Sequence, residues 1–170
     1  MYKLRISAVL FFMAGVLSAS PRLAIPEMGD DLRLPGIDSG IETFALEDIK
    51  SPALVLLVYD LYCPACQKSA RNMKHMAEKI DDAFPTIPTL GVGSGDTPFE
   101  AKAFKDKFKL PFPCISDREK SVAEHYEVKK TPSVIVLIRS AEGKAFTEVY
   151  RHEGYLGREH VEQVFDALEE

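Results

Sequence analysis

The pattern of apolar and polar residues predicts a buried strand followed directly by an amphipathic helix. Residues 53–59, with the sequence ALVLLVY, form an unbroken apolar run between Pro52 and Asp60, which is typical of a central strand buried on both faces. After Pro64 the apolar residues recur at steps of three and four, as on the buried face of a helix: Cys66, Ala70, Met73, Ala77 and Ile80. The sequence CPAC therefore lies where a buried strand turns into a helix.

The rest of the chain predicts further strands and helices around this unit. Helices are expected where apolar residues recur with helical spacing, at residues 98–109, 121–126 and 158–170. Strands are expected within TIPTLGVGSGD and FPCISD, over residues 133–139, and in AFTEVYRHEG, which returns as an antiparallel strand. Residues 21–51 are rich in Pro, Gly and Asp and predict a short strand and a turn that lie against the sheet. This order predicts a single α/β domain with a mixed central β-sheet sandwiched by helices.

The composition fits one globular domain preceded by an export signal. The chain has 170 residues, of which 46% are hydrophobic and 28% charged, so one domain can bury a sizeable core. Lys3 and Arg5 precede an apolar run at 6–17 and the small residues LSAS, the pattern of a secretory signal peptide. That run is shorter than the about 20 residues that cross a bilayer as a helix. We therefore expect a signal peptide at 1–20, a domain at 21–170, and export to the bacterial periplasm without stable membrane association after cleavage.

The charge of the chain argues against nucleic acid as a partner. Lys and Arg number 21 against 26 Asp and Glu, and removal of the expected signal peptide makes the protein more acidic still. A nucleic-acid-binding surface needs a concentration of basic residues, and no run of basic residues suggests a lipid surface either. We therefore expect neither nucleic acid nor a membrane among the partners.

The spacing Cys63-Pro-Ala-Cys66 is open to three interpretations. A zinc site needs four ligands, yet the remaining candidates show no paired spacing: Cys114, His75, His125, His152 and His160. A structural disulfide would close a very small loop, which removes little entropy from the unfolded chain and stabilises the protein weakly. A redox pair fits best, because a lone C-x-x-C beside a strand–helix–strand pattern is typical of thiol redox proteins. We therefore expect no metal.

Each position of the motif has a physical reason in a redox pair. Cys63 is expected at the N-cap of the helix and Pro64 at its first position, where the missing N–H costs nothing. The positive end of the helix then lowers the pKa of Cys63 and makes its thiolate the attacking group. Cys66, one turn inside the helix, would attack the mixed disulfide and release the product. We expect no cofactor other than the redox-active disulfide Cys63–Cys66.

Three segments carry a resemblance to a known family: FALEDIKSPALVLLVYDLYCPAC, FKDKFKLPFPCISD and HYEVKKTPSVIVLI. Over residues 31–168 the chain resembles the thioredoxin superfamily, specifically exported thiol–disulfide oxidoreductases of the TlpA/ResA type and their peroxiredoxin-like AhpC/TSA relatives. The resemblance implies a thioredoxin-like fold and a cis peptide bond at Thr131–Pro132 that faces the cysteines. It also implies client binding at Tyr62, Pro64, Ala65, Thr131 and Pro132. The implied partners are client proteins with cysteines or disulfides and an electron-donor or electron-acceptor protein.

The chain departs from this family at two positions. Tyr62 stands where Trp usually precedes the first cysteine, and Leu57 stands where thioredoxin has a buried acid. Proton transfer to and from Cys66 must then use water or another group, for which Asp60 and Glu153 are the candidates in the sequence. The direction of electron flow stays open, because the Pro-Ala dipeptide resembles oxidising members and the flanking sequence resembles reducing ones.

Two other functions are weighed as alternatives. A peroxiredoxin-like peroxidase would need a threonine three residues before its reactive cysteine, but Asp60 precedes Cys63 at that spacing and Cys63 precedes Cys66. A non-enzymatic Cu(I) chaperone would hold copper with soft thiolates and a histidine, but such relatives use a wider cysteine spacing. Cys114 is expected to be a small buried residue of a strand, with a role as a resolving thiol as the alternative.

Overall fold

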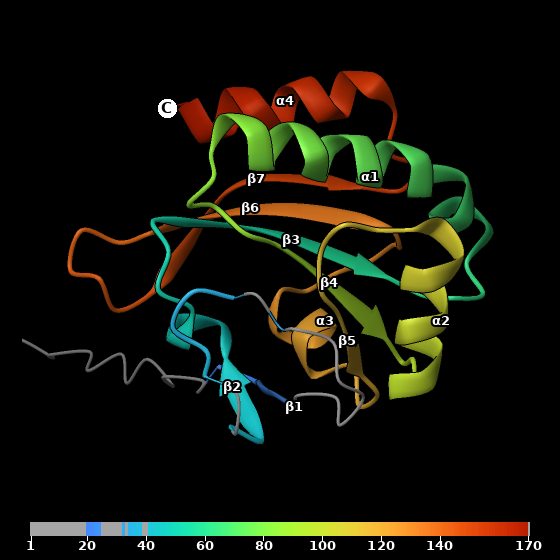
Figure 1. Cartoon of the computed structure of the whole chain (residues 1–170), viewed down its shortest axis with the longest axis horizontal. Coiled ribbons are helices and arrows are strands. Elements are labelled where there is room, and N and C mark those ends of the chain that lie inside the picture. The colour runs from blue at the N-terminus through green and yellow to red at the C-terminus, as the bar shows by residue number, and fades with distance from the viewer. Residues whose placement is uncertain (1–19, 25–31, 33, 39–40, 170) are drawn as a thin grey trace, which may run out of the picture.

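The computed structural model describes residues 20–24, 32, 34–38 and 41–169 (Figure 1). The predicted signal peptide at 1–20 falls outside the described residues except for its last position, so its cleavage stays a prediction. Within the described ranges, no helix has both the length and the apolar character that crossing a membrane requires.

A five-stranded mixed sheet forms the centre of the fold, as the sequence pattern predicts. Its strands are β3 (Ala53–Tyr59), β4 (Thr89–Ser94), β5 (Cys114–Asp117), β6 (Ser133–Arg139) and β7 (Phe146–Glu153). They lie in the order β5-β4-β3-β6-β7; β3, β4 and β5 are mutually parallel, β6 is antiparallel to β3, and β7 is antiparallel to β6. The strand predicted at residues 53–59 is therefore the central one, and all of its residues are buried.

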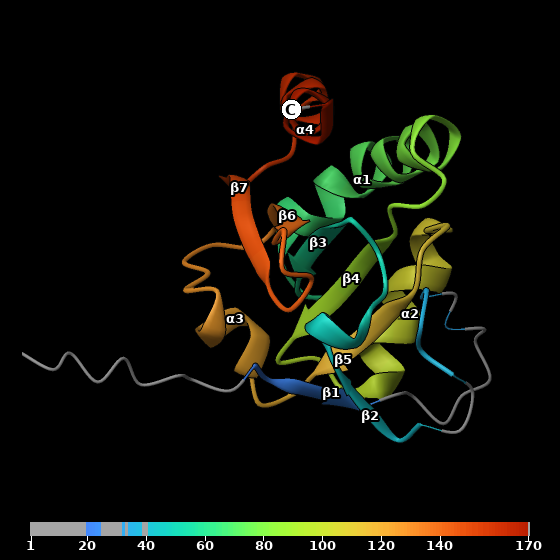
Figure 2. The same ribbon diagram turned by 90° about the vertical axis from the view of Figure 1, so that its left-hand side faces the viewer.

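Helices cover the sheet on both faces, so the predicted α/β sandwich is confirmed (Figure 2). They are α1 (Pro64–Ala83), α2 (Pro98–Phe108), α3 (Ser121–His125) and α4 (Arg158–Glu169). In both views α1 and α4 lie side by side over one face, and Phe104 of α2 joins the core beneath them. Alternate residues of β3 supply the two cores: Val55, Leu57 and Tyr59 on the α1 side, and Leu54, Leu56 and Val58 on the other.

The N-terminal segment packs on the second face of the sheet. β1 (Arg22–Ala24) and β2 (Thr43–Ala45) form a separate antiparallel pair, which a short 3-10 helix, η1 (Leu46–Asp48), follows. The described part of this segment contributes five buried side chains to the core that also holds α3: Leu23, Leu34, Phe44, Leu46 and Ile49. The expected strand against the sheet is thus confirmed, but the structure has two strands there, because three residues are too few for an alternation to show in the sequence.

The topology brings three loops together at one edge of the sheet. Because β3 and β4 are parallel, their carboxyl ends lie at the same edge. β6 runs the other way, so its first residue, Ser133, pairs with Val58 at that edge. The edge therefore gathers the cysteine motif after β3, the loop after β4 and the Thr131–Pro132 loop before β6.

Candidate active site

Cys63 occupies the N-cap of α1, as the sequence predicts. Pro64 is the first helical residue, and the backbone N–H of Cys66 donates to the Sγ of Cys63 over 3.2 Å. The carbonyl of Cys63 accepts the backbone N–H of Gln67 at 3.1 Å, which begins the helix. The sulfur thus faces backbone N–H groups that have no partner within the helix, and such groups stabilise a negative charge.

This position lowers the pKa of the Cys63 thiol. Partial burial raises the pKa, but hydrogen bonds with the side chains of Cys66 and Thr131 and with the backbone of Cys66 and Ala65 outweigh burial. The net pKa of Cys63 is below its ordinary value. Because the thiolate is the nucleophilic form, Cys63 is the group suited to attack.

Cys66 has the opposite environment. Its side chain is 0% exposed and belongs to the core cluster beneath α1 and α4. Burial, together with the hydrogen bond to Cys63, raises the pKa of Cys66 far above its ordinary value. Both cysteines are free thiols in this structure, so the arrangement is that of the reduced pair.

The Thr131–Pro132 peptide bond is cis and lies against the cysteines, and both predictions are therefore confirmed. The thiol of Cys63 donates to the carbonyl oxygen of Thr131 over 3.3 Å. Pro132 is buried, and its carbonyl accepts the backbone N–H of Gly154 at 2.7 Å, just after β7. Thr131 itself is half-buried, so part of this residue stays accessible beside the reactive sulfur.

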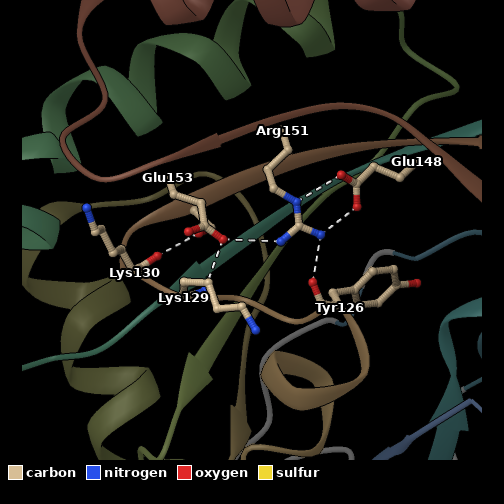
Figure 3. Close-up of polar contacts among 7 residues, drawn as sticks. Tyr126, Lys129, Lys130, Glu148, Arg151 and Glu153 are labelled. Carbon is tan, nitrogen blue, oxygen red and sulfur yellow. Dashed lines mark hydrogen bonds and ion pairs between the residues drawn. The ribbon is translucent and has the colours of Figure 1, made fainter.

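A network on β7 holds the loop that leads to Thr131 (Figure 3). The guanidinium of Arg151 donates to both carboxylate oxygens of Glu148, at 2.8 and 2.6 Å, and to the carbonyl of Tyr126 at 2.6 Å. It also donates to Glu153 at 3.2 Å, and the same Glu153 oxygen accepts the backbone N–H of Lys129 at 3.0 Å. Glu153, a sequence candidate for proton transfer, therefore anchors this loop.

The remaining predicted client-binding residues surround Cys63 on the surface. Tyr62 is 71% exposed, and its hydroxyl donates to Glu100 of α2 at 2.8 Å. Pro64 is exposed and Ala65 is half-buried. Asp60, the other sequence candidate for proton transfer, accepts the backbone N–H of Tyr62 at 2.6 Å. Asp60 therefore shapes the turn before Cys63.

A cleft begins beside this surface. It has a volume of about 510 Å³ and is lined by Asp60 and Thr131 at the active-site end and by residues around α3 farther along. Thr131 lies both on this cleft and within 3.3 Å of the Cys63 sulfur. One end of the cleft therefore lies close to the reactive sulfur.

Sequence reasoning missed one acid at the site, Asp96. Its side chain is 2% exposed, and its two carboxylate oxygens accept the backbone N–H of Leu61 at 3.1 and 3.3 Å. Burial raises the pKa of Asp96 to about 6, against the lowering effect of the Leu61 N–H. The only signal in the sequence is the position of Asp96 after β4. That position points to the active-site edge once β3 and β4 are known to be parallel, because parallel strands place their carboxyl ends at one edge. Leu57, where thioredoxin has its acid, is buried in the core.

Cys114 lies in the core at the start of β5. Its side chain is 8% exposed, and its thiol donates to the carbonyl of Phe112 over 3.9 Å. The expectation of a small buried residue in a strand is confirmed. Among the described residues, no group of three or more His, Cys, Asp or Glu side chains could hold a metal ion.

Comparison with known proteins places the chain in a family. A model of the AhpC/TSA family matches residues 25–150, which is most of the chain. The chain belongs to the AhpC/TSA family. The resemblance to the thioredoxin superfamily is thereby confirmed, with ResA-type oxidoreductases and peroxiredoxins among the relatives of this family member.

Two curated relatives are a thiol-disulfide oxidoreductase and a peroxiredoxin. Thiol-disulfide oxidoreductase ResA of Halalkalibacterium halodurans is 24% identical over 98 residues, covering 56% of this chain and 53% of that protein. Chloroplastic peroxiredoxin Q of Populus jackii is 30% identical over 92 residues, covering 54% of this chain and 42% of that protein. The chain thus spans about half the length of the curated relatives it matches.

Solved structures show the fold. A secreted disulfide oxidoreductase of Mycobacterium tuberculosis, homologous to DsbE of E. coli, superposes with a TM-score of 0.57 at 17% identity. The match covers 74% of this chain and 89% of the other. A candidate thioredoxin of Neisseria meningitidis superposes with a TM-score of 0.61 at 15% identity, covering 88% of this chain and 89% of the other. The fold is therefore thioredoxin-like, as the resemblance in sequence implies.

Proposed function

We propose that this protein is a thiol–disulfide oxidoreductase that exchanges electrons with disulfides or thiols of client proteins. The observation that carries the proposal is the asymmetry of the two cysteines. The pKa of Cys63 is lowered at the start of α1, whereas Cys66 is fully buried and its pKa is raised. One thiol is thus ready to attack as a thiolate, and the other is held back until the first has reacted.

In the reducing direction the exchange takes two steps. The Cys63 thiolate attacks one sulfur of a client disulfide; a Cys63–client bond forms, and the other client sulfur leaves as a thiolate and takes up a proton. Cys66 then loses its proton and attacks the Cys63 sulfur, and the first client sulfur leaves and is protonated in turn. The client gains two electrons and two protons, and Cys63–Cys66 becomes a disulfide. An electron-donor protein must then reduce this disulfide, and the same steps run backwards would oxidise a client.

The order of the steps follows from the contact between the two thiols. After burial, the hydrogen bond with Cys63 is the next largest contribution that raises the pKa of Cys66. A mixed disulfide at Cys63 carries no negative charge, so it no longer opposes ionisation of Cys66. Cys66 is therefore activated by the attachment of a client.

The surface around Cys63 suits an extended client segment. The backbone of Thr131 lies beside the sulfur, and a strand added along it can form backbone hydrogen bonds while its own sulfur meets Cys63. The exposed ring of Tyr62 next to Cys63 offers an apolar contact, and the cleft beside Asp60 gives the segment a path. Recognition through backbone contacts fits a protein with several clients.

We place this exchange outside the cytoplasm. The apolar run at 6–17 after Lys3 and Arg5 has the pattern of a signal peptide, and the Mycobacterium tuberculosis neighbour is described as secreted. Disulfides persist in such oxidising compartments. Export is tested by expressing the full chain in a bacterium and sequencing the N-terminus of the periplasmic protein. A new terminus at or just before the expected boundary at residue 20 supports export, and an intact Met1 in the cytoplasm contradicts it.

Peroxide reduction, the chemistry of peroxiredoxins, fits the site less well. At the spacing where a peroxidase needs a hydroxyl, Asp60 precedes Cys63, and Cys66 has no exposed surface at which to meet peroxide. A Cu(I) site would need a histidine beside the thiols, but His152 and His160 instead stack on each other with ring centroids 3.5 Å apart. Exchange with a protein disulfide therefore stands first.

Three assays separate these functions on the same preparation. Reduction of insulin disulfides, consumption of hydrogen peroxide and titration with Cu(I) are measured for the wild type, Cys63→Ser and Cys114→Ser. We expect insulin reduction that Cys63→Ser abolishes and Cys114→Ser leaves intact, together with slow peroxide consumption. Full exchange by Cys63→Ser would overturn the proposal, and tight stoichiometric Cu(I) binding with no exchange would favour the chaperone.

A further inference from the structure

Two contacts join the start of α2 to the turn that carries the reactive cysteine. The carboxylate of Asp96 accepts the backbone N–H of Leu61, 35 residues away in sequence, at 3.1 and 3.3 Å. The hydroxyl of Tyr62 donates to Glu100, 38 residues away, at 2.8 Å. The two residues that precede Cys63 are thus both fixed to the segment after β4.

The backbone of Asp96 is itself held firmly in place. Its N–H donates to the carbonyl of Gly93 at 3.2 Å, and its carbonyl accepts the hydroxyl of Ser116 on β5 at 2.5 Å. A Cβ atom at Gly93 would lie only 2.7 Å from a carboxylate oxygen of Asp96, so glycine at this position leaves room for the side chain to fold back. The carboxylate is therefore aimed at Leu61 by the sheet.

We propose that Asp96 is a positioning residue whose ionised carboxylate holds the Leu61–Cys63 turn in the geometry that activates Cys63. The proposal rests on the proposed function only in taking Cys63 as the reactive thiol. Through Leu61, Asp96 fixes the turn from which Cys63 enters α1, where its sulfur meets the N–H of Cys66 at 3.2 Å. A looser turn would weaken that contact and make the thiolate less stable.

The contact makes the reactivity of Cys63 depend on pH. Burial raises the pKa of Asp96 to about 6, and the Leu61 N–H lowers that pKa. By reciprocity, ionisation of Asp96 strengthens its contact with Leu61, and protonation weakens it. Below about pH 6, protonation of Asp96 should therefore lower the reactivity of Cys63. This loss adds to the loss caused by protonation of the Cys63 thiolate itself.

Several polar groups from the neighbouring elements face Asp96. Asp60 from the loop after β3 and Glu100 from α2 both add negative charge, which raises the pKa of Asp96. A backbone hydrogen bond from Thr97 lowers the pKa of Glu100, so Glu100 stays ionised where Asp96 titrates. The Tyr59 hydroxyl from β3 is neutral there because burial raises its pKa, and Ser116 from β5 does not titrate.

The test is the pH profile of Cys63 alkylation in the full reduced chain. Iodoacetamide rates at Cys63, located by fragment-ion mass spectrometry, are measured from about pH 4.5 to about pH 8. The variants are Asp96→Asn, which keeps an acceptor oxygen but cannot ionise, and Asp96→Ala, which removes the acceptor. The matched control is Asp117→Asn, because Asp117 is also a buried acid but accepts N–H groups of α3.

The expected profiles differ in slope. Below about pH 6, the wild type and Asp117→Asn should lose rate more steeply than tenfold per pH unit, because two groups take up protons. Asp96→Asn should lose no more than about tenfold per unit, and Asp96→Ala should be slower than the wild type at neutral pH by about tenfold. Superimposed profiles of the wild type and Asp96→Asn would overturn the proposal, even if Asp96→Ala fails to fold.

The alkylation test needs no client protein, so its result can differ from the result for the proposed function. A steep wild-type profile that Asp96→Asn flattens, in a protein that exchanges with no disulfide, would support the role of Asp96 and contradict the proposed function. Normal disulfide exchange, together with superimposed alkylation profiles of the wild type and Asp96→Asn, would support the proposed function and contradict the role of Asp96.

Discussion

The thiol of Cys63 donates a hydrogen bond to the carbonyl of Thr131, 68 residues farther along the chain, over 3.3 Å. This contact joins the start of α1 to the loop before β6 and so brings the attacking sulfur to a stretch of backbone that a client can pair with. The same sulfur accepts the N–H of Cys66. Cys63 is therefore the reactive group, and its sulfur also joins the start of α1 to the loop before β6.

The different environments of the two cysteines predict different labelling. Because the pKa of Cys63 is lowered and that of Cys66 is raised, Cys63 should react with iodoacetamide at a pH well below that of an ordinary thiol. Cys66 should stay unlabelled until the protein unfolds. Mass spectrometry of the reduced protein after short exposure checks this, and faster labelling of Cys66 would reverse the assigned roles.

The network of Arg151 predicts a variant that separates client exchange from thiol reactivity. Arg151→Met removes the contacts to Glu148, Glu153 and Tyr126 and should release the loop that leads to Thr131. We expect a loss of about 1–2 kcal/mol in urea unfolding and slower exchange with a peptide disulfide. Cys63 alkylation should change by less than about threefold.

The control for this variant is Arg158→Met, at the exposed start of α4. It should change stability by no more than about 0.5 kcal/mol. If Arg151→Met exchanges at the wild-type rate, the loop does not need the network to present Thr131.

Burial of Cys114 predicts that it takes no part in the redox disulfide. The oxidised protein should contain one intramolecular bond, Cys63–Cys66, and Cys114 should label only as the protein unfolds. Peptide mapping of the oxidised protein under non-reducing conditions checks the pairing. A bond from Cys114 to either cysteine of the motif would revive its role as a resolving thiol.

Asp96 predicts an unusual dependence of stability on pH. Its pKa of about 6 in the folded protein lies above the value of about 4 in an unfolded chain, so the folded state binds more protons between these values. The contribution of Asp96 to stability is therefore full below about pH 4 and is lost as the pH rises through about 6. Asp96→Asn keeps the fold without the buried charge.

In thermal unfolding, Asp96→Asn should be more stable than the wild type at neutral pH by about 1–2 kcal/mol and no more stable at about pH 4.5. A variant that is less stable at both pH values would show that the ionised carboxylate stabilises the fold. That result would contradict the raised pKa.

The sequence pattern predicts the elements that carry the chemistry because they are long or strongly patterned. β3 is an unbroken apolar run, and α1 shows its buried face at Cys66, Ala70, Met73, Ala77 and Ile80, all of which are buried. The N-cap position of Cys63 follows from Pro64 alone. The three-residue strands β1 and β2 are too short to show a period, so only part of that segment could be foreseen.

Side-chain partners from distant parts of the chain could not be foreseen in the same way. Glu153 and Asp60 stay candidates for proton transfer, but their contacts with the backbone N–H groups of Lys129 and Tyr62 could not be read from the sequence. Asp96 is buried beside the active-site turn, although nothing in GSGD alone distinguishes it from an exposed loop acid. Its position becomes clear only once β3 and β4 are known to be parallel neighbours.

The most direct test of the account is to trap the first step of the exchange. Cys66→Ser leaves Cys63 able to attack a client disulfide but removes the thiol that would release the product. Incubation of this variant with a disulfide-bonded peptide, followed by intact-mass and fragment-ion spectrometry, should show one peptide joined to Cys63 in a stable mixed disulfide. Attachment at Cys114, or no adduct while the wild type still reduces the peptide, would contradict the assignment of Cys63 as the attacking thiol.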